Sequence, residues 1–209
     1  MSRSRVISFI KAGVFVAALG PLAWLVGKAA QNDLGANPVE FVTHATGDWA
    51  LIFLLSSLAI TPLRKLASIP DLIRFRRMLG LYAFFYASLH LLTFVGLDHH
   101  FHWAEVLPDV YKRPFVTAGF SAWLLMVPLA LTSTAWSIRK MGGKKWAALH
   151  RLVYFSAIAG VVHYWWLVKK DITDPAMYAA ALAVLLGYRL VLKLADRRRG
   201  AAPTLVTGS

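Results

Sequence analysis

The sequence predicts an all-α integral membrane protein, a six-span helical bundle with both termini in the cytoplasm. Three observations support this prediction: long apolar runs, basic connectors that alternate with less basic ones, and histidines inside the apolar runs. Of the 209 residues, 58% are hydrophobic, and the mean hydropathy is +0.56. These values are well above those of a soluble domain of this length.

Six apolar segments are long enough, or nearly so, to cross a bilayer. We expect them at about 12–27, 49–62, 78–97, 115–136, 146–168 and 176–192. Together they make one membrane domain, residues 1–195, and we expect residues 196–209 to form a short disordered cytoplasmic tail. The first segment follows a basic start, so a cleaved signal peptide is the alternative to a retained anchor.

The basic residues predict the orientation of the bundle. Of the 23 lysines and arginines, 18 fall at the N-terminus, in the connectors 2–3 and 4–5, and near the C-terminus, while eight of the ten acids fall in the other connectors. Cytoplasmic loops carry an excess of Lys and Arg. Both termini are therefore expected in the cytoplasm, and the net charge of +13 indicates topology and anionic lipid, with no nucleic acid as a partner.

Cysteine is absent. Its absence excludes disulfides, thiolate-held iron–sulfur clusters and the covalent attachment of c-type haem. Any haem bound by this chain is therefore non-covalent, and nitrogen ligation by histidine is the expected mode.

The stretch 146–168 carries two histidines, His150 and His163, and we expect the chain to be organised around it. An intramembrane histidine costs free energy and commonly marks an ion path, a proton relay or a ligand. His90, in the third segment, lies 13 residues after Arg77, and His163 lies 13 residues after His150. His90 and His163 are thus predicted at similar depth on two helices that run outward, where they can bind one haem iron from opposite sides.

The residues before these two histidines favour a flat ligand. Gly160, Ala159 and Ser156 precede His163 and are small, which leaves room for a macrocycle. On the third segment, Ala83 and Tyr86 precede His90, and we expect Tyr86 to orient an imidazole or a haem propionate.

His150 is predicted about 20 Å along the helix from His163, so the two cannot bind the same iron. We expect an inner site at His150 that holds either a second haem or a flavin. Arg76, Arg77, Lys144 and Lys145 are candidates for contacts to a flavin phosphate or a propionate.

The remaining histidines are less informative. His99, His100 and His102 form a cluster, but nothing in the sequence predicts a rigid element to hold a metal there. We expect these three residues and His44 to be exposed loop histidines.

These residues together resemble a known family, the ferric-reductase-like transmembrane domain, and within it the haem-binding membrane subunits of bacterial periplasmic methionine sulfoxide reductase systems. The resemblance covers nearly the whole chain. The matching motifs are Arg76-Arg77-Met78-Leu79-Gly80-Leu81 before His90, and Leu149-His150-Arg151-Leu152 before His163.

The resemblance implies a six-span inner-membrane cytochrome b that binds haem b and FMN, with His90 and His163 as haem ligands and His150 as the inner histidine. It implies electron transfer from the quinone pool, or from a cytosolic flavin reductase, to a periplasmic molybdopterin subunit. That subunit reduces methionine sulfoxide in oxidised proteins, so the chain itself is expected to be an electron-transfer subunit without catalytic residues.

The chain departs from larger members of the family in two ways. They carry two histidines on each of two helices, whereas the third segment here has only His90. They also append a flavin- and NAD(P)H-binding domain, and this chain has no G-x-G-x-x-G motif. The electrons must therefore come from another molecule.

Two other functions remain open from the sequence. One is a proton or metal transporter that uses His90, His150 and His163 as its path, although no repeated half is visible. The other is a haem-binding anchor for a partner that moves no electrons. A bound chromophore separates the transporter from both haem hypotheses, and reduction by a quinol analogue separates the relay from the anchor.

Overall fold

The computed structural model describes residues 2–200, whose regular structure is helical throughout. The elements are α1 (Arg3–Ala17), α2 (Gly20–Ala30), α3 (Pro38–Leu66), η1 (Pro70–Leu72), α4 (Ile73–Leu92), η2 (Thr93–Asp98), α5 (Trp103–Lys112), α6 (Pro114–Leu131), α7 (Ala135–Met141), α8 (Gly143–Leu149), α9 (Leu152–Leu167) and α10 (Thr173–Gly200). The prediction of an all-α protein is confirmed for this part of the chain.

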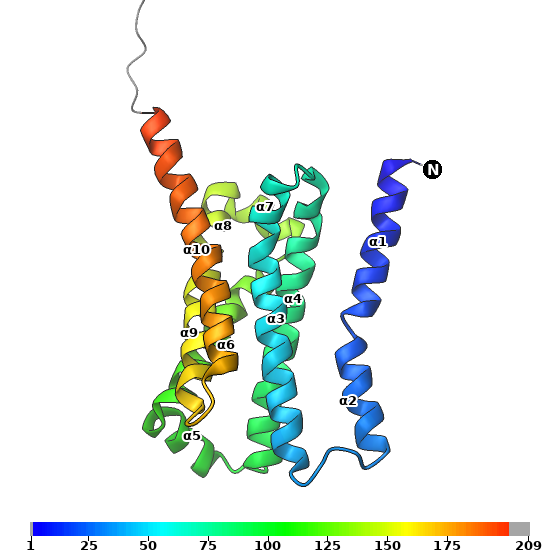
Figure 1. Ribbon diagram of the computed structural model, residues 1–209, viewed down its shortest axis with the longest axis vertical. Helices are drawn as coiled ribbons and strands as arrows, with labels where there is room; N and C mark the ends of the chain where they lie inside the picture. The colour runs from blue at the N-terminus through cyan, green and yellow to red at the C-terminus, as the bar shows by residue number, and fades with distance from the viewer. Residues whose placement is uncertain (1, 201–209) are drawn as a thin grey trace, which may run out of the picture.

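The long helices run roughly side by side, with α3 and α4 in the middle, α1 and α2 on one side, and α6, α9 and α10 on the other (Figure 1). The start of α1 and the end of α10 lie at the same end of the bundle, here called the terminal end (Figure 1). Five segments are long and apolar enough to cross a membrane: Arg3–Ala30, Pro38–Leu66, Pro70–Asp98, Pro114–Leu131 and Thr173–Ala195. The protein is therefore a multi-pass membrane protein.

The first two expected spans have different bounds in the structure. Residues 12–27 do not form one helix, because the chain breaks between α1 and α2. The polar stretch before Trp49 is helical from Pro38 onward, so α3 is much longer than predicted. Asn37 caps α3 by accepting a hydrogen bond from the Glu40 N–H at 3.3 Å, and Pro38 occupies the first turn. An asparagine cap followed by proline is a common signal for the start of a helix. The sequence analysis missed it because the segment is polar.

The expected fifth span, 146–168, is not one helix. It is divided into α8 and α9 by a turn at His150 and Arg151. The Trp146 carbonyl accepts from both the His150 N–H and the His150 imidazole Nδ1, each at 3.0 Å. From Ala148 to Tyr154 the backbone bonds tighten to i−3 spacing. The helix that remains, α9, has 16 residues.

The connectors and ends also differ from expectation. Residues 98–114, predicted as a loop, contain α5, and residues 137–145 fall in α7 and α8. The sixth expected span is part of α10, which continues to Gly200. The expected tail, 196–209, therefore begins inside this helix, and its residues 201–209 lie outside the described part of the chain.

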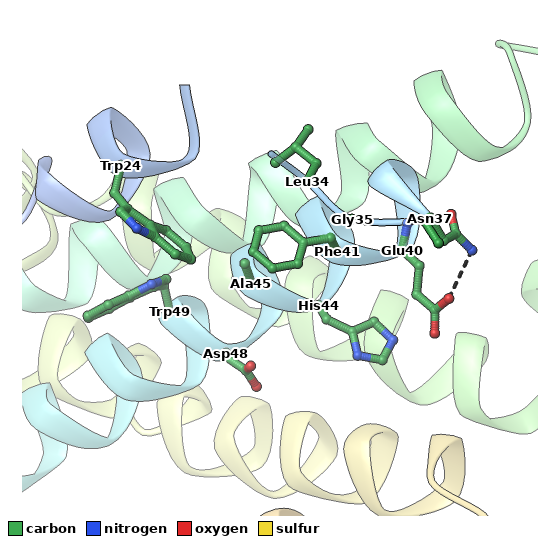
Figure 2. Close-up of a pocket in the computed structure, with 11 residues that line it drawn as sticks. Trp24, Leu34, Gly35, Asn37, Glu40, Phe41, His44, Ala45, Asp48 and Trp49 are labelled. Carbon is green, nitrogen blue, oxygen red and sulfur yellow. Dashed lines mark hydrogen bonds between the residues drawn. The ribbon is translucent and has the colours of Figure 1, made fainter. Parts of the chain in front are cut away.

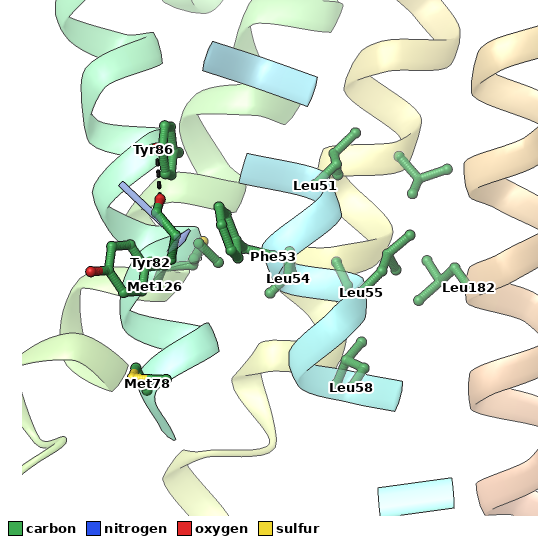
Figure 3. Close-up of a cluster of buried hydrophobic side chains, with 14 residues drawn as sticks. Leu51, Phe53, Leu54, Leu55, Leu58, Met78, Tyr82, Tyr86, Met126 and Leu182 are labelled. Atoms are coloured by element: carbon green, nitrogen blue, oxygen red, sulfur yellow. Dashed lines mark hydrogen bonds between the residues drawn. The ribbon is translucent and has the colours of Figure 1, made fainter. Parts of the chain in front are cut away.

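The core is centred on α3 rather than on the stretch 146–168. Half of the apolar window of α3 is buried, against 11–22% in the other four candidate spans. Its side chains pack against α4, α6, α9 and α10 (Figure 3). The largest contributions on α3 come from Leu51, Phe53, Leu54, Leu55 and Leu58. Phe53 stacks on Tyr86 of α4 with ring centroids 5.3 Å apart.

A proline inside α3 connects this helix to α10. Pro62 has no N–H, so the carbonyl of Leu58, four residues earlier, lacks its helical donor. The Arg189 guanidinium of α10 donates to that carbonyl and also lies over the Tyr154 ring of α9 at 5.5 Å. Arg189 therefore satisfies a backbone group that Pro62 leaves free, and it joins three helices.

The break between α1 and α2 is held by a tyrosine of α4. The Tyr86 hydroxyl donates to the Ala18 carbonyl at 2.9 Å and accepts from the Leu22 N–H at 3.2 Å. These two backbone groups would bond each other in a continuous helix, so the hydroxyl is inserted into the helical ladder, a known cause of kinks. Tyr82 binds the Phe15 carbonyl one turn away, at 2.7 Å.

Candidate functional site

His90 of α4 and His163 of α9 face each other inside the bundle. Their ring centroids are 5.9 Å apart, and the ring planes are inclined at 74°. An imidazole nitrogen lies about 2 Å from a metal that it binds, so two rings on opposite sides of one ion have centroids roughly 6 Å apart. The spacing of the two rings thus fits a single metal ion between them.

Each imidazole is oriented by a backbone carbonyl of a neighbouring helix. His90 Nδ1 lies 2.9 Å from the Thr43 carbonyl of α3, and His163 Nδ1 lies 2.6 Å from the Phe115 carbonyl of α6. A carbonyl only accepts, so Nδ1 carries the proton in both rings. Nε2 then has a free lone pair, which is the tautomer of a histidine that binds a metal through Nε2.

A glycine makes room for each ring. Gly47 follows Thr43 by one helical turn, and a Cβ there would lie 3.1 Å from the His90 ring. Gly119 follows Phe115 by one turn, and a Cβ there would lie 2.7 Å from His163 Nδ1. Any side chain at Gly119 would force the His163 ring away from its carbonyl partner.

The two halves of the site repeat one arrangement. In the α3–α4 pair and again in the α6–α9 pair, one helix carries the histidine, and the other supplies a carbonyl and, four residues later, a glycine. The sequence analysis found no repeated half. The repeat is visible only in space, because the carbonyls carry no sequence signal.

The two rings lie in a largely apolar cavity of about 340 Å³ between the two helix pairs. Seven of its lining residues are glycine, alanine or serine: Gly47, Ala50, Ala87, Gly119, Ala122, Ser156 and Gly160. Ser156 and Gly160 therefore lie where the sequence placed them, whereas Ala159 is not in the lining. Ser156 donates its hydroxyl to the Ala122 carbonyl at 2.8 Å, which joins α9 to α6. The small residues leave an apolar space next to both imidazoles.

Among the residues that the structure describes, Arg113 is the only lysine or arginine in the lining of this cavity. It lies at the end opposite the terminal end, where α5 meets α6, and its guanidinium binds the Asp109 carboxylate at 3.2 Å. The sequence analysis did not select it, because two adjacent basic residues in a loop have no specific signal.

The structure places Tyr86 away from this cavity. Its side chain is fully buried, and both hydrogen bonds of its hydroxyl go to the break between α1 and α2. The Tyr86 hydroxyl therefore binds neither imidazole, because α4 is rotated so that Ala87, His90 and Leu91 line the cavity instead.

His150 lies at the turn before α9, far along that helix from His163. Its ring stacks on Trp146 with centroids 3.8 Å apart, and its Nε2 is buried without a hydrogen-bond partner in the described structure. Arg76 and Arg77 occupy the first turns of α4, and Lys144 and Lys145 lie in α8, near the terminal end of the bundle (Figure 1). None of these four lines the His90–His163 cavity.

The other histidines are only partly as expected. His100 and His102 are exposed, but the His99 side chain is 12% exposed and lies 3.3 Å from the Asp109 carboxylate. No group of three potential ligands in the described residues is arranged to bind a metal ion. His44 is exposed, but it belongs to helix α3 rather than to a loop.

A second pocket, of about 590 Å³, lies between α2 and α3. Figure 2 shows its aromatic residues, Trp24, Phe41 and Trp49, together with His44 and Asp48. His44 and Asp48 also line the histidine cavity, so the two spaces adjoin at these side chains.

Comparison with known proteins shows the family of the chain. The family described as ferric reductase like transmembrane component matches residues 45–161, which contain His90, His150, Gly47 and Gly119. The chain belongs to the ferric reductase-like transmembrane family. Within this family it is similar along most of its length to proteins named protein-methionine-sulfoxide reductase heme-binding subunit MsrQ.

Three such relatives illustrate the similarity. MsrQ of Rhodospirillum rubrum is 51% identical over 191 residues, 91% of this chain and 92% of its own length. MsrQ of Herminiimonas arsenicoxydans is 52% identical over 88% of this chain and 85% of its own length. MsrQ of Xanthomonas euvesicatoria is 51% identical over 88% of this chain and 87% of its own length. No solved structure matches the chain.

Proposed function

We propose that this ferric reductase-like protein is a membrane cytochrome b subunit that relays electrons across the bacterial inner membrane. The donor is the quinone pool or a cytosolic flavin reductase, and the acceptor is a periplasmic molybdopterin methionine sulfoxide reductase, MsrP, which repairs oxidised periplasmic proteins. The observation that carries the proposal is the pair of imidazoles, 5.9 Å apart, whose Nδ1 atoms are both bound to helix carbonyls. The relatives' name, heme-binding subunit, supports the same chemistry.

His90 and His163 would hold the haem iron through their Nε2 atoms. Bound there, haem supplies a one-electron couple whose potential depends on its axial ligands and on its burial. The chain contains no cysteine, so the haem would be held non-covalently, and the family resemblance implies haem b. Thr43 and Phe115 fix the orientation of the two rings, and hydrogen bonding of this kind raises the basicity of a ligating imidazole.

The cavity fits a flat, mostly apolar ligand. Glycine, alanine and serine line it near both rings, and Leu51, Leu54 and Met126 close its apolar side. At the end opposite the terminal end, Arg113 presents a guanidinium to the same space. A guanidinium is well suited to bind a carboxylate, so Arg113 is our candidate for a propionate contact.

We propose six membrane crossings with both termini in the cytoplasm. The start of α1 and the end of α10 lie at one end of the bundle (Figure 1), which requires an even number of crossings. Five helical segments meet the length and hydropathy of a span, and α9, with 16 residues, would be the sixth. The excess of lysine and arginine at the terminal end agrees with a cytoplasmic position.

We further propose an inner site near the terminal end, built around His150, for FMN or a second haem. The supporting observation is the buried Nε2 of His150, which has no partner among the described residues. A buried polar atom without a partner is unusual in a stable protein. Arg76, Arg77, Lys144 and Lys145 would supply the positive charge for a phosphate or a propionate.

The experiment that tests this function uses the purified full-length chain in lipid nanodiscs. A quinol analogue is added first, and the visible spectrum should change from the oxidised to the reduced form. Addition of purified MsrP with a methionine sulfoxide substrate should then reoxidise it. Reduction without reoxidation by MsrP would leave a haem protein with another acceptor and would contradict the proposed partner. Failure of both the quinol and a flavin reductase to reduce the protein would contradict the relay.

A further inference from the structure

Helix α5 is a short helix that does not cross the bundle. It has ten residues, about 15 Å, and it connects η2 to α6 at the end opposite the terminal end (Figure 1). The segments on either side of it, Pro70–Asp98 and Pro114–Leu131, are both candidate spans. α5 therefore lies where two spans leave the apolar layer.

One face of α5 is apolar and exposed. Trp103, Leu107 and Tyr111 follow each other at intervals of four residues, so they form one stripe along the helix. Their exposed fractions are 59%, 61% and 69%. Phe101, just before the helix, is also 56% exposed. We call these four residues the α5 stripe.

The rest of α5 is fixed to the bundle, both beside the stripe and on the side of the helix opposite to it. Val106 is buried, with 4% exposed, and Val110 lines the histidine cavity. Asp109 lies 3.3 Å from His99 and 3.2 Å from Arg113, and Thr117 of α6 donates to the Val110 carbonyl. These contacts set the rotation of α5 and leave the stripe exposed on the outside of the bundle.

The composition and position of the stripe match a membrane surface. Tryptophan and tyrosine are enriched at the boundary between headgroups and acyl chains. Trp165 and Trp166, at the end of α9, are exposed at the same end of the bundle. Lys112 lies beside Tyr111, with its ammonium 5.9 Å from the Tyr111 ring, and a lysine there can extend toward lipid phosphates.

We propose that α5 is an interfacial helix whose stripe inserts into the lipid leaflet at the end of the bundle opposite the termini. Amphipathic helices of this kind lie in the plane of the membrane with their apolar face at the boundary of the acyl region. Because Val110 and Arg113 line the histidine cavity and Asp109 of α5 holds Arg113, the helix also covers one end of that cavity. The bilayer then holds this cover in place. The inference does not depend on haem or on electron transfer.

The absence of cysteine from the chain allows a direct test. Leu107→Cys is labelled with a nitroxide in the full-length protein in nanodiscs of phosphatidylethanolamine and phosphatidylglycerol. Collision rates are measured with oxygen, which concentrates in lipid, and with a water-soluble nickel chelate. Glu105→Cys is the matched control, because it lies on the same helix with a side chain that is 69% exposed. Tyr111→Cys is a second reporter in case Leu107→Cys does not fold.

We expect the labels at positions 107 and 111 to collide at least several times more often with oxygen than with the chelate, and the label at 105 to show the reverse. High accessibility of position 107 to the chelate in nanodiscs would overturn the proposal. A position 107 label that becomes protected only when purified MsrP is added would also overturn it, because the stripe would then be a protein-docking surface. A label shielded from both reagents would indicate a contact with a second copy of the chain, which is equally incompatible with insertion into lipid.

Discussion

Gly119 and His163 lie so close that a single added carbon would disturb them: a Cβ on Gly119 would be 2.7 Å from His163 Nδ1. This contact lets the imidazole reach the Phe115 carbonyl at 2.6 Å. The position of a proposed haem ligand on α9 is thus set by the absence of a side chain on α6.

The Gly119→Ala substitution should therefore displace the His163 ring. We expect haem affinity to fall roughly 10- to 100-fold, the usual range when an orienting contact to a ligand is lost. Gly47→Ala should have a smaller effect in the same direction, because its Cβ would lie 3.1 Å from the His90 ring. Haem titration of the purified apoprotein measures both effects. Gly80→Ala on α4, where a Cβ meets nothing within 4 Å, is the control, and equal losses in all three variants would contradict the argument.

Larger side chains in the lining of the cavity should exclude the ligand without unfolding the bundle. Ala87→Leu and Ser156→Leu both project into the cavity, and each should lower the haem content of the purified protein. Ala159→Leu is the matched variant, because Ala159 is on the same helix as Ser156 but outside the lining. Haem per polypeptide and far-ultraviolet circular dichroism are the two measurements. Full haem content in both cavity variants would show that the ligand binds elsewhere.

Tyr86→Phe should weaken the packing of the N-terminal helices and leave haem binding unchanged. The substitution removes the hydroxyl that joins the Ala18 carbonyl to the Leu22 N–H. Leaving one buried polar group without a partner costs about 1–3 kcal/mol, so the thermal midpoint should fall. If instead the haem spectrum changed while the thermal midpoint stayed constant, Tyr86 would have the ligand-orienting function that the sequence suggested.

Arg189 and Pro62 should be energetically coupled. Arg189→Met leaves the Leu58 carbonyl without a donor, so it should destabilise the bundle by about 1–3 kcal/mol. In the Pro62→Ala background the residue at position 62 has an N–H that can bond this carbonyl, and Arg189→Met should cost less. A double-mutant cycle of unfolding free energies in detergent measures the coupling. Additive effects would show that an N–H at position 62 does not replace the Arg189 contact with Leu58.

Much of the architecture follows from hydropathy and charge. The long apolar runs were sufficient to predict an all-α membrane protein, and the structure confirms both statements for residues 2–200. The equal spacings, from Arg77 to His90 and from His150 to His163, predicted a common depth, and the structure brings the two rings together. Depth depends only on the rise per residue, which is constant in a helix.

Helix rotation and local breaks were harder to predict. Tyr86 is one turn before His90, yet it faces α1 and α2, because the direction of a side chain depends on how neighbouring helices pack. The break at His150 and Arg151 falls inside the predicted fifth span, and apolar patterning contains no signal for it. Every residue has a backbone carbonyl, so the sequence could not single out those of Thr43 and Phe115 as partners of the two histidines. Only the glycines four residues later, Gly47 and Gly119, offered a signal.

The central claim is that His90 and His163 bind one haem. The most direct test is the visible spectrum of the detergent-purified protein, oxidised and then reduced with dithionite, with haem per polypeptide quantified, beside His90→Ala and His163→Ala. We predict a low-spin b-type spectrum in the parent that is lost in both variants. A parent protein without haem after haem-replete expression, or full haem content in either variant, would contradict this account, and the haem-free result would instead favour a proton or metal transporter.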